Sequence, residues 1–366
     1  MIDGAGTGPV VTNSLRVFHN TSVTYFAGLG KPGPPVIHPV PVRTIAGVGT
    51  VRDALASPAL LRRLALAQLG ANVAIVVTGG AVRLTGSGLG CPTWPRCTDA
   101  SYVVTRATGY HGVIEFSNRM LTPVLGLLAV ACVVAALAQV RRVRARVRWS
   151  VLALAVIPAQ AVLGGVVVLT HLNPWLVGGH FLLSVAALTA CDRLWRAATA
   201  ADAPATPVVP VPLAHLVRLL VGLALAVLVA GTVVTGSGPH SGDSARPRRT
   251  GLNPDMIAQL HTDLVMLLVG ATVALYLAAL ATRAPARLVR ATAVLAGAEL
   301  AQGAIGFVAH FTGLPILLVA LHMAGSCAVW LAALAVPAAT ASRPPAVPAG
   351  SPPPPDRTAQ LAHLAG

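Results

Sequence analysis

The chain alternates between long apolar runs and short polar connections. An α-helix needs about 20 apolar residues to cross a bilayer. Eight runs reach that length, at 64–83, 109–138, 149–169, 176–196, 213–235, 255–281, 289–309 and 315–337. This pattern predicts an all-α integral membrane protein with eight transmembrane helices, surrounded by membrane lipid.

The connections between the runs differ in charge. Arginine clusters fall on one side, at "LRR" (61–63), "RRVRARVR" (141–148), "RLWR" (193–196) and "RAPARLVR" (283–290). By the positive-inside rule that side is the cytoplasm, although "RPRR" (246–249) lies on the other side. We therefore expect a multi-pass protein of the cell membrane with both termini in the cytoplasm.

The composition supports the membrane class and excludes a nucleic-acid partner. Of the 366 residues, 55% are hydrophobic and 10% are charged, whereas a soluble domain has about 25% charged residues. In a soluble protein the net charge of +15 would point to nucleic acid. Here the arginines lie between apolar runs and are interpreted as topology signals.

The second half of the chain repeats the first. The sequence "TGSG" at 85–88 recurs at 235–238, and two glutamines are each followed 20 residues later by a histidine. These pairs are Gln160 with His180 and Gln302 with His322. We expect two tandem four-helix bundles related by pseudo-twofold symmetry. Because each half has an even number of helices, the repeat is parallel, unlike the inverted repeats of many transporters.

The repeat divides the chain into five predicted segments. Residues 1–60 are expected to form a disordered cytoplasmic leader, and the Pro-rich residues 339–366 a disordered cytoplasmic tail. The N-terminal bundle is predicted at 61–197, a cytoplasmic linker at 198–212 and the C-terminal bundle at 213–338.

Three histidines are predicted at similar depth in the outer half of the membrane. His180, His261 and His322 each lie within two turns of the outer end of a predicted helix. Ionisable side chains there are costly and usually functional, although a single histidine can also serve only as an interhelical hydrogen-bond donor. His261 and His322 belong to one bundle, where facing imidazoles can hold a haem iron. Zinc would need further ligands nearby, and none are evident.

The first half differs from the second in its polar side chains. Asn118 stands 143 positions before His261, where symmetry predicts a ligand. Glu115 lies one helical turn before Asn118 on the same face. It is interpreted either as an acid/base group facing a substrate or as the ion-pair partner of Arg119. His111 lies two turns outward, about 10 Å away along the helix.

Together these motifs resemble the haem A synthase family, the membrane oxidases that convert haem O to haem A. The resemblance rests on "GGAVRLTGSGLGCPTWPRC" (79–97), "HGVIEFSNRML" (111–121), the glutamine–histidine segments and the eight-helix repeat, and it covers residues 64–337. It implies that the C8 methyl group of the porphyrin is oxidised in successive steps to a formyl group, with water as the oxygen source. The product would supply cytochrome oxidase assembly.

The resemblance also implies roles for individual residues. The C-terminal bundle would hold a b-type haem, haem b, between His261 and His322. The N-terminal bundle would receive haem O as substrate. There His180 would match a histidine at the substrate iron, and Glu115 would match a carboxylate needed for activity.

Two features of the N-terminal half bear on this assignment. Asn118 stands where the family has a fourth histidine, so either His180 is the sole ligand there or His111 contributes. Cys91 and Cys97 match a cysteine pair that some family members carry in the first outer loop. Their spacing allows a disulfide, which an oxidising outer face would favour, and the bond would be either structural or a redox relay.

The implied partners are haem O, the haem O synthase that supplies it, the cytochrome oxidase assembly machinery and an electron acceptor that the sequence does not name. A homo-oligomer is compatible with the sequence.

The alternative function is a bis-histidine b-type membrane cytochrome that only carries electrons. Glu115 favours an asymmetric active site, because Ala258 stands at its repeat position. A parallel-repeat transporter is disfavoured because Pro158 has no counterpart in the seventh run. Glu299, also in a predicted membrane helix, has no assigned role.

Overall fold

The computed structural model describes residues 48–243, 245 and 247–343. Contacts divide the chain into a unit that ends at Asp53 and a second unit that begins at Ala54. The short helix α1 (Val48–Leu55) crosses this boundary. Most of the predicted leader, residues 1–47, and most of the predicted tail, residues 344–366, lie outside the described residues.

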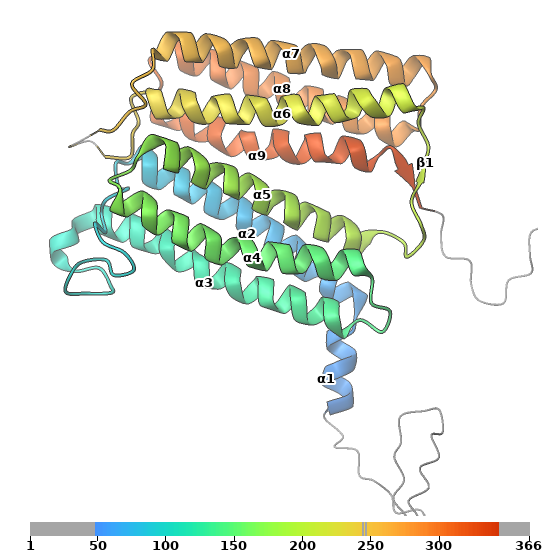
Figure 1. Cartoon of the computed structure of the whole chain (residues 1–366), viewed down its shortest axis with the longest axis horizontal. Helices are drawn as coiled ribbons and strands as arrows, with labels where there is room; N and C mark the ends of the chain where they lie inside the picture. Colours follow the sequence, from blue (N-terminus) through green and yellow to red (C-terminus); the bar gives the residue numbers. More distant parts are fainter. Residues whose placement is uncertain (1–47, 244, 246, 344–366) are drawn as a thin grey trace, which may run out of the picture. The chain divides into compact units, whose positions relative to one another are not determined.

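Long helices make up most of the second unit (Figure 1). They are α2 (Pro58–Leu84), α3 (Gly109–Ala138), α4 (Arg144–Leu169), α5 (Pro174–Thr199), α6 (Val211–Ser237), α7 (Pro254–Ala281), α8 (Ala286–Phe311) and α9 (Ile316–Ala338). Among the described residues these eight helices are long and apolar enough to cross a membrane. The predicted class, an all-α multi-pass membrane protein, is confirmed.

Several helices begin before the apolar run that predicted them. Helices α2, α5 and α7 have proline in their first turn, where the missing N–H has no partner in any case. The side chains of Asn173 and Asn253 cap α5 and α7 by accepting hydrogen bonds from the backbone of Trp175 and Asp255. Residues 48–55 in α1 and 58–60 at the start of α2 are helical, in contrast to the disorder predicted for this end of 1–60.

The helices lie in two neighbouring groups of four (Figure 1). In the first group, α2 and α4 each contact both α3 and α5, and in the second group α6 and α8 each contact both α7 and α9. The groups meet where α2 and α5 contact α6 and α9. The pseudo-twofold relation between the groups stays a prediction.

Loops of the two groups are joined at the end of the helices that is predicted to face outward. The N–H of Gly88 donates to the carbonyl of Gly242 over 2.9 Å, and the Arg83 guanidinium donates to the carbonyl of Thr235 over 2.8 Å. At the other end, β1 (Thr206–Pro207) pairs antiparallel with β2 (Ala341–Ser342). The predicted linker and the first residues of the predicted tail therefore form a short ladder.

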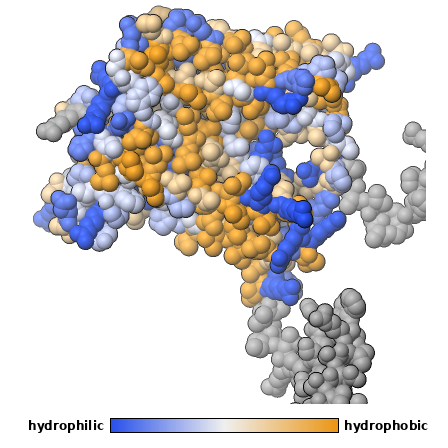
Figure 2. Space-filling model, viewed as in Figure 1, coloured by the Kyte–Doolittle hydropathy of each residue, from blue (hydrophilic) through white to orange (hydrophobic). Residues whose placement is uncertain are grey.

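The surface over the helices is apolar. Figure 2 shows hydrophobic side chains along the helices and hydrophilic ones toward the helix ends. Leu127 is 73% exposed and Leu317 is 69% exposed. Large exposed aliphatic side chains of this kind are costly in water and are expected where a helix faces lipid.

Candidate functional site

Two imidazoles face each other inside the second group of helices. His261 on α7 and His322 on α9 have ring centroids 6.5 Å apart, with ring planes at 78°. Metal–imidazole bonds are about 2 Å long, so two rings that coordinate one iron from opposite sides have centres roughly 6 Å apart. The two side chains therefore lie at a separation that suits bis-histidine coordination.

Glycines on the neighbouring helices make room for these rings. A Cβ atom built on Gly231 of α6 would lie 3.3 Å from Cε1 of His261, and one built on Gly306 of α8 would lie 3.1 Å from Cε1 of His322. Nδ1 of each ring is buried without a hydrogen-bond partner, although the Val227 and Gln302 backbones lie beside the rings. Buried nitrogens of this kind are rare unless they serve a function. The donor set and the glycine cradle therefore fit a haem.

A third imidazole in the first group has the same kind of surroundings. A Cβ atom on Gly164 of α4 would lie 3.2 Å from Cε1 of His180 on α5, and Nδ1 of His180 is also buried without a partner. The amide of Gln160 donates to the His180 carbonyl over 3.2 Å and to the Ser184 hydroxyl over 2.6 Å. The glutamine, glycine and histidine of the sequence repeat are thus brought together in the first group.

Asn118 is held by the neighbouring helix. Its Oδ1 accepts a hydrogen bond of 2.7 Å from the hydroxyl of Thr78 on α2. A Cβ atom on Gly79, the next residue of α2, would lie 3.9 Å from Asn118 Nδ2. One oxygen of the amide is therefore already engaged, and an iron-ligand role for Asn118 stays a prediction.

His111 is anchored by the first copy of the repeated turn. Its Nδ1 lies 2.8 Å from the Ser87 hydroxyl, which lies 2.8 Å from the Thr85 hydroxyl. In the second copy, the Ser237 hydroxyl lies 2.6 Å from that of Thr250 instead. The serine of each "TGSG" copy therefore holds a side chain of its own group, His111 in the first and Thr250 in the second.

Glu115 is buried, with 6% of its surface exposed, and both carboxylate oxygens have partners. Oε2 accepts a hydrogen bond of 2.8 Å from the backbone N–H of Cys91, and Oε1 accepts one of 3.1 Å from Nε of Arg119. The ion-pair interpretation of Glu115 is therefore seen in the structure. An acid–base role for the same carboxylate stays a prediction.

A disulfide joins Cys91 and Cys97, and both residues are buried. The predicted bond is confirmed, and residues 91–97 are called the disulfide loop below. The ring of Trp94 in this loop packs onto α4, where a Cβ atom on Gly165 would overlap it. The loop therefore reaches the helix position next to Gly164, which faces His180.

Comparison with known proteins identifies the family. Residues 62–334 match the family of cytochrome oxidase assembly proteins called COX15-CtaA. The chain belongs to the COX15-CtaA family. A heme A synthase from Geobacillus kaustophilus (strain HTA426) is 28% identical over 106 residues, which is 29% of this chain and 32% of that protein. The chain thus spans about a third of the length of this curated relative.

The two groups of this COX15-CtaA chain differ elsewhere in their buried polar groups. In the second group, the Thr272 hydroxyl donates to Oε1 of Glu299 over 2.8 Å, and Oε2 of Glu299 is buried without a partner. Within the described residues, no three His, Cys, Asp or Glu side chains gather as they would around a metal ion.

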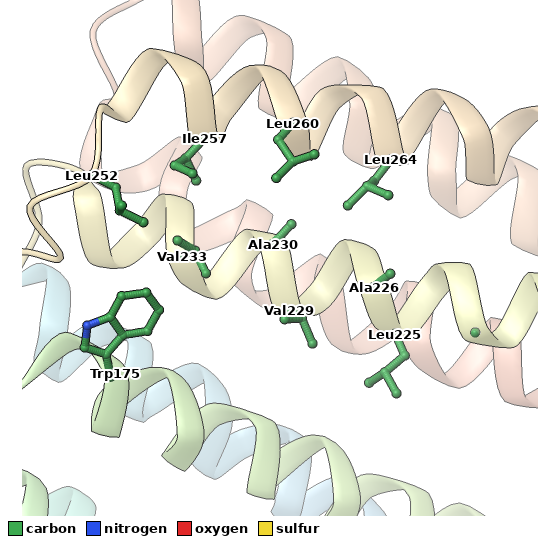
Figure 3. A pocket seen from close by; sticks show the side chains of 11 residues that line it. Trp175, Leu225, Ala226, Val229, Ala230, Val233, Leu252, Ile257, Leu260 and Leu264 are labelled. Atoms are coloured by element: carbon green, nitrogen blue, oxygen red, sulfur yellow. The ribbon is translucent and has the colours of Figure 1, made fainter.

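An apolar groove of about 650 Å³ runs along α6 and α7, beside the helix positions that flank His261 (Figure 3). Ala230 lies next to Gly231 in its wall, and Leu260 lies next to His261. Trp175, at the start of α5, lies at one end of the groove. Since the wall offers only apolar side chains apart from the Trp175 nitrogen, the groove suits hydrocarbon.

Proposed function

We propose that the protein is a haem A synthase of the cell membrane, which oxidises the C8 methyl group of haem O to a formyl group. The observation that carries this proposal is the contrast between the two groups. The second group holds a facing pair of cradled imidazoles, whereas the first holds one cradled imidazole and the disulfide loop, to which the Glu115 carboxylate is hydrogen-bonded. A resident haem in one group and a substrate site in the other account for that contrast.

In this proposal His261 and His322 hold haem b, which supplies one-electron transfer when bound. Their glycine cradles support this assignment, and so do the Val227 and Gln302 backbones beside the rings, since an iron-ligating histidine usually donates its other ring N–H to such a carbonyl. The two imidazoles would hold this group between α7 and α9. The helices around them exclude water, because their outward faces are covered with apolar side chains.

The first group would receive haem O, with His180 facing the substrate iron. His111 stands as a second residue of this site, held at Nδ1 by Ser87. Conversion of a methyl to a formyl group takes up one water molecule and releases four protons and four electrons in two two-electron steps, through the alcohol. The electrons would pass to an external acceptor, and haem O would come from its synthase.

Orientation in the membrane follows from charge. The arginine clusters at 61–63, 141–148, 193–196 and 283–290 favour the cytoplasm for their end of the helices. Both termini would then be cytoplasmic, and the disulfide loop would lie outside, where disulfides persist. Delivery of the product to cytochrome oxidase assembly agrees with the family description.

The test is production of haem A. The chain is expressed with a haem O synthase in a host that makes no haem A, and the extracted haems are separated by chromatography and identified from pyridine haemochrome spectra. We expect haem A from the parent protein and none from His180→Ala, which should keep its b-type spectrum. Unconverted haem O beside an intact b-type spectrum in the parent would instead support an electron-carrying cytochrome.

A further inference from the structure

Glu115 and Arg119, called the clamp below, bind the backbone of the disulfide loop at several points. Arg119 donates to the carbonyl of Cys91 over 2.8 Å, of Thr93 over 3.1 Å and of Arg96 over 3.3 Å. Glu115 accepts from the N–H of Cys91 over 2.8 Å. The clamp thus satisfies backbone groups along most of the loop, and it joins that loop to α3.

The clamp uses a geometry that few other side chains can provide. A guanidinium has five donors in a rigid plane, and here they reach three loop carbonyls and the Glu115 carboxylate. A lysine has one nitrogen and cannot span these acceptors. A carboxylate accepts from Arg119 and from the Cys91 N–H through two separate oxygens. Charge-assisted hydrogen bonds of this kind are about twice as strong as neutral ones.

The loop that the clamp holds meets the His180 site from the outside. Gly165 lies under the Trp94 ring, and its neighbour Gly164 lies against the His180 imidazole. Gly90, directly before the loop, packs so tightly on α3 that a Cβ atom there would overlap the backbone of His111. The chain at the disulfide loop is therefore in contact with α3, which carries His111 and Glu115, and with α4, which cradles His180.

We propose that the clamp positions the disulfide loop, and that the Trp94 ring of this loop forms the outer wall of the substrate site at His180. This inference rests on the proposed function and specifies what Glu115 does within it. Glu115 then supports conversion by holding the wall in place. It is a positioning residue, since both of its oxygens are engaged with the loop and with Arg119.

The experiment measures the loop directly, apart from catalysis. The full-length protein is treated with a dithiol reductant, and the new thiols are trapped with a maleimide reagent that shifts the band on a gel. Cys91→Ser/Cys97→Ser gives the background from buried Cys132, Cys191 and Cys327. Affinity for haem O is measured in parallel by spectral titration.

We expect Glu115→Gln and Arg119→Lys to speed reduction of the disulfide about tenfold or more, since each loses charge-assisted bonds. Both should weaken haem O binding. Gly165→Ala should weaken haem O binding without touching the clamp, because its methyl group displaces the Trp94 ring. The matched control is Gly126→Ala on α3, where a Cβ atom meets nothing within 4 Å, and it should change neither measurement.

Two results would overturn the inference. If Glu115→Gln abolished conversion while the reduction rate and the haem O affinity stayed at parent values, the carboxylate would act on the substrate as an acid or base. If the loop loosened with no effect on haem O binding, the loop would not be a wall of the site.

A b-type spectrum retained by each variant shows that it has folded. Neither loop measurement requires conversion, so a parent protein that binds haem O without oxidising it would refute only the proposed function.

Discussion

A methyl group added at Gly306 would press on the His322 imidazole from the neighbouring helix. The added Cβ atom would lie 3.1 Å from Cε1 of His322, whereas carbon atoms in contact prefer about 3.5–4.0 Å. The ring would have to move by roughly half an ångström to relieve this contact. Without haem the imidazole can turn away, but with haem bound it must point at the iron, so the strain falls on the haem-bound state.

The size of the effect can be bounded. Overpacking a well-filled interior costs about 1–3 kcal/mol. At about 1.4 kcal/mol for each factor of ten, Gly306→Ala should weaken haem b binding roughly 5- to 150-fold. The helix itself should gain up to about 1 kcal/mol, because alanine is a better helix former than glycine. Thermal stability of the apoprotein can therefore rise while haem occupancy falls.

The assay is the ratio of b-type haem to polypeptide, taken from pyridine haemochrome spectra of protein made under limiting haem supply. Gly303→Ala is the matched control, because it lies on the same helix one turn away and its Cβ atom meets nothing within 4 Å. It should gain the same helix stability and keep full occupancy. If the two variants had equal haem content and equal spectra, the reasoning that Gly306 cradles an iron-ligating imidazole would be refuted.

Three further substitutions have defined outcomes. His261→Ala should remove most b-type absorbance, and full occupancy in that variant would exclude it as an axial ligand. Asn118→His should free the Thr78 hydroxyl and offer the first group a second imidazole. The substrate haem should then give a low-spin spectrum, and turnover should be slower. An unchanged spectrum with unchanged turnover would contradict the interpretation that His180 is the sole ligand. Thr272→Val removes the hydroxyl that donates to Glu299. It should lower the free energy of unfolding by about 1–3 kcal/mol, which thermal unfolding measures. An unchanged stability would mean that another group donates a hydrogen bond to Glu299.

Much of the fold could be predicted from the sequence, because membrane helices are dictated by length and apolarity alone. The eight predicted runs all lie within or largely within observed helices. Their ends were less accurate, since capping by residues such as Asn173 and Asn253 extends a helix past its apolar run. That the rings of His261 and His322 face each other was predictable, because each residue lies within two turns of the outer end of a predicted helix in the same bundle.

The glycine cradles and the clamp on the loop were harder to predict. Whether Gly306 faces His322 depends on the rotation of each helix about its axis, which the even apolar coating of these helices does not reveal. The pairing of Glu115 with Arg119 was foreseeable from their spacing of four residues. Its extension to the Cys91 backbone was not, because the path of an irregular loop leaves no periodic signal.

The bonds that join the two groups, at the end predicted to face outward, bear on how far either group can change without separating from the other. Arg83 donates to a main-chain carbonyl at Thr235, and the contact between Gly88 and Gly242 is main chain to main chain. Every residue type supplies a carbonyl, so substitutions on the acceptor side leave these bonds intact. Side chains on that side can therefore change in one group while the two groups stay attached. In this chain, the chemistry of each group and the attachment between the groups are carried by different atoms.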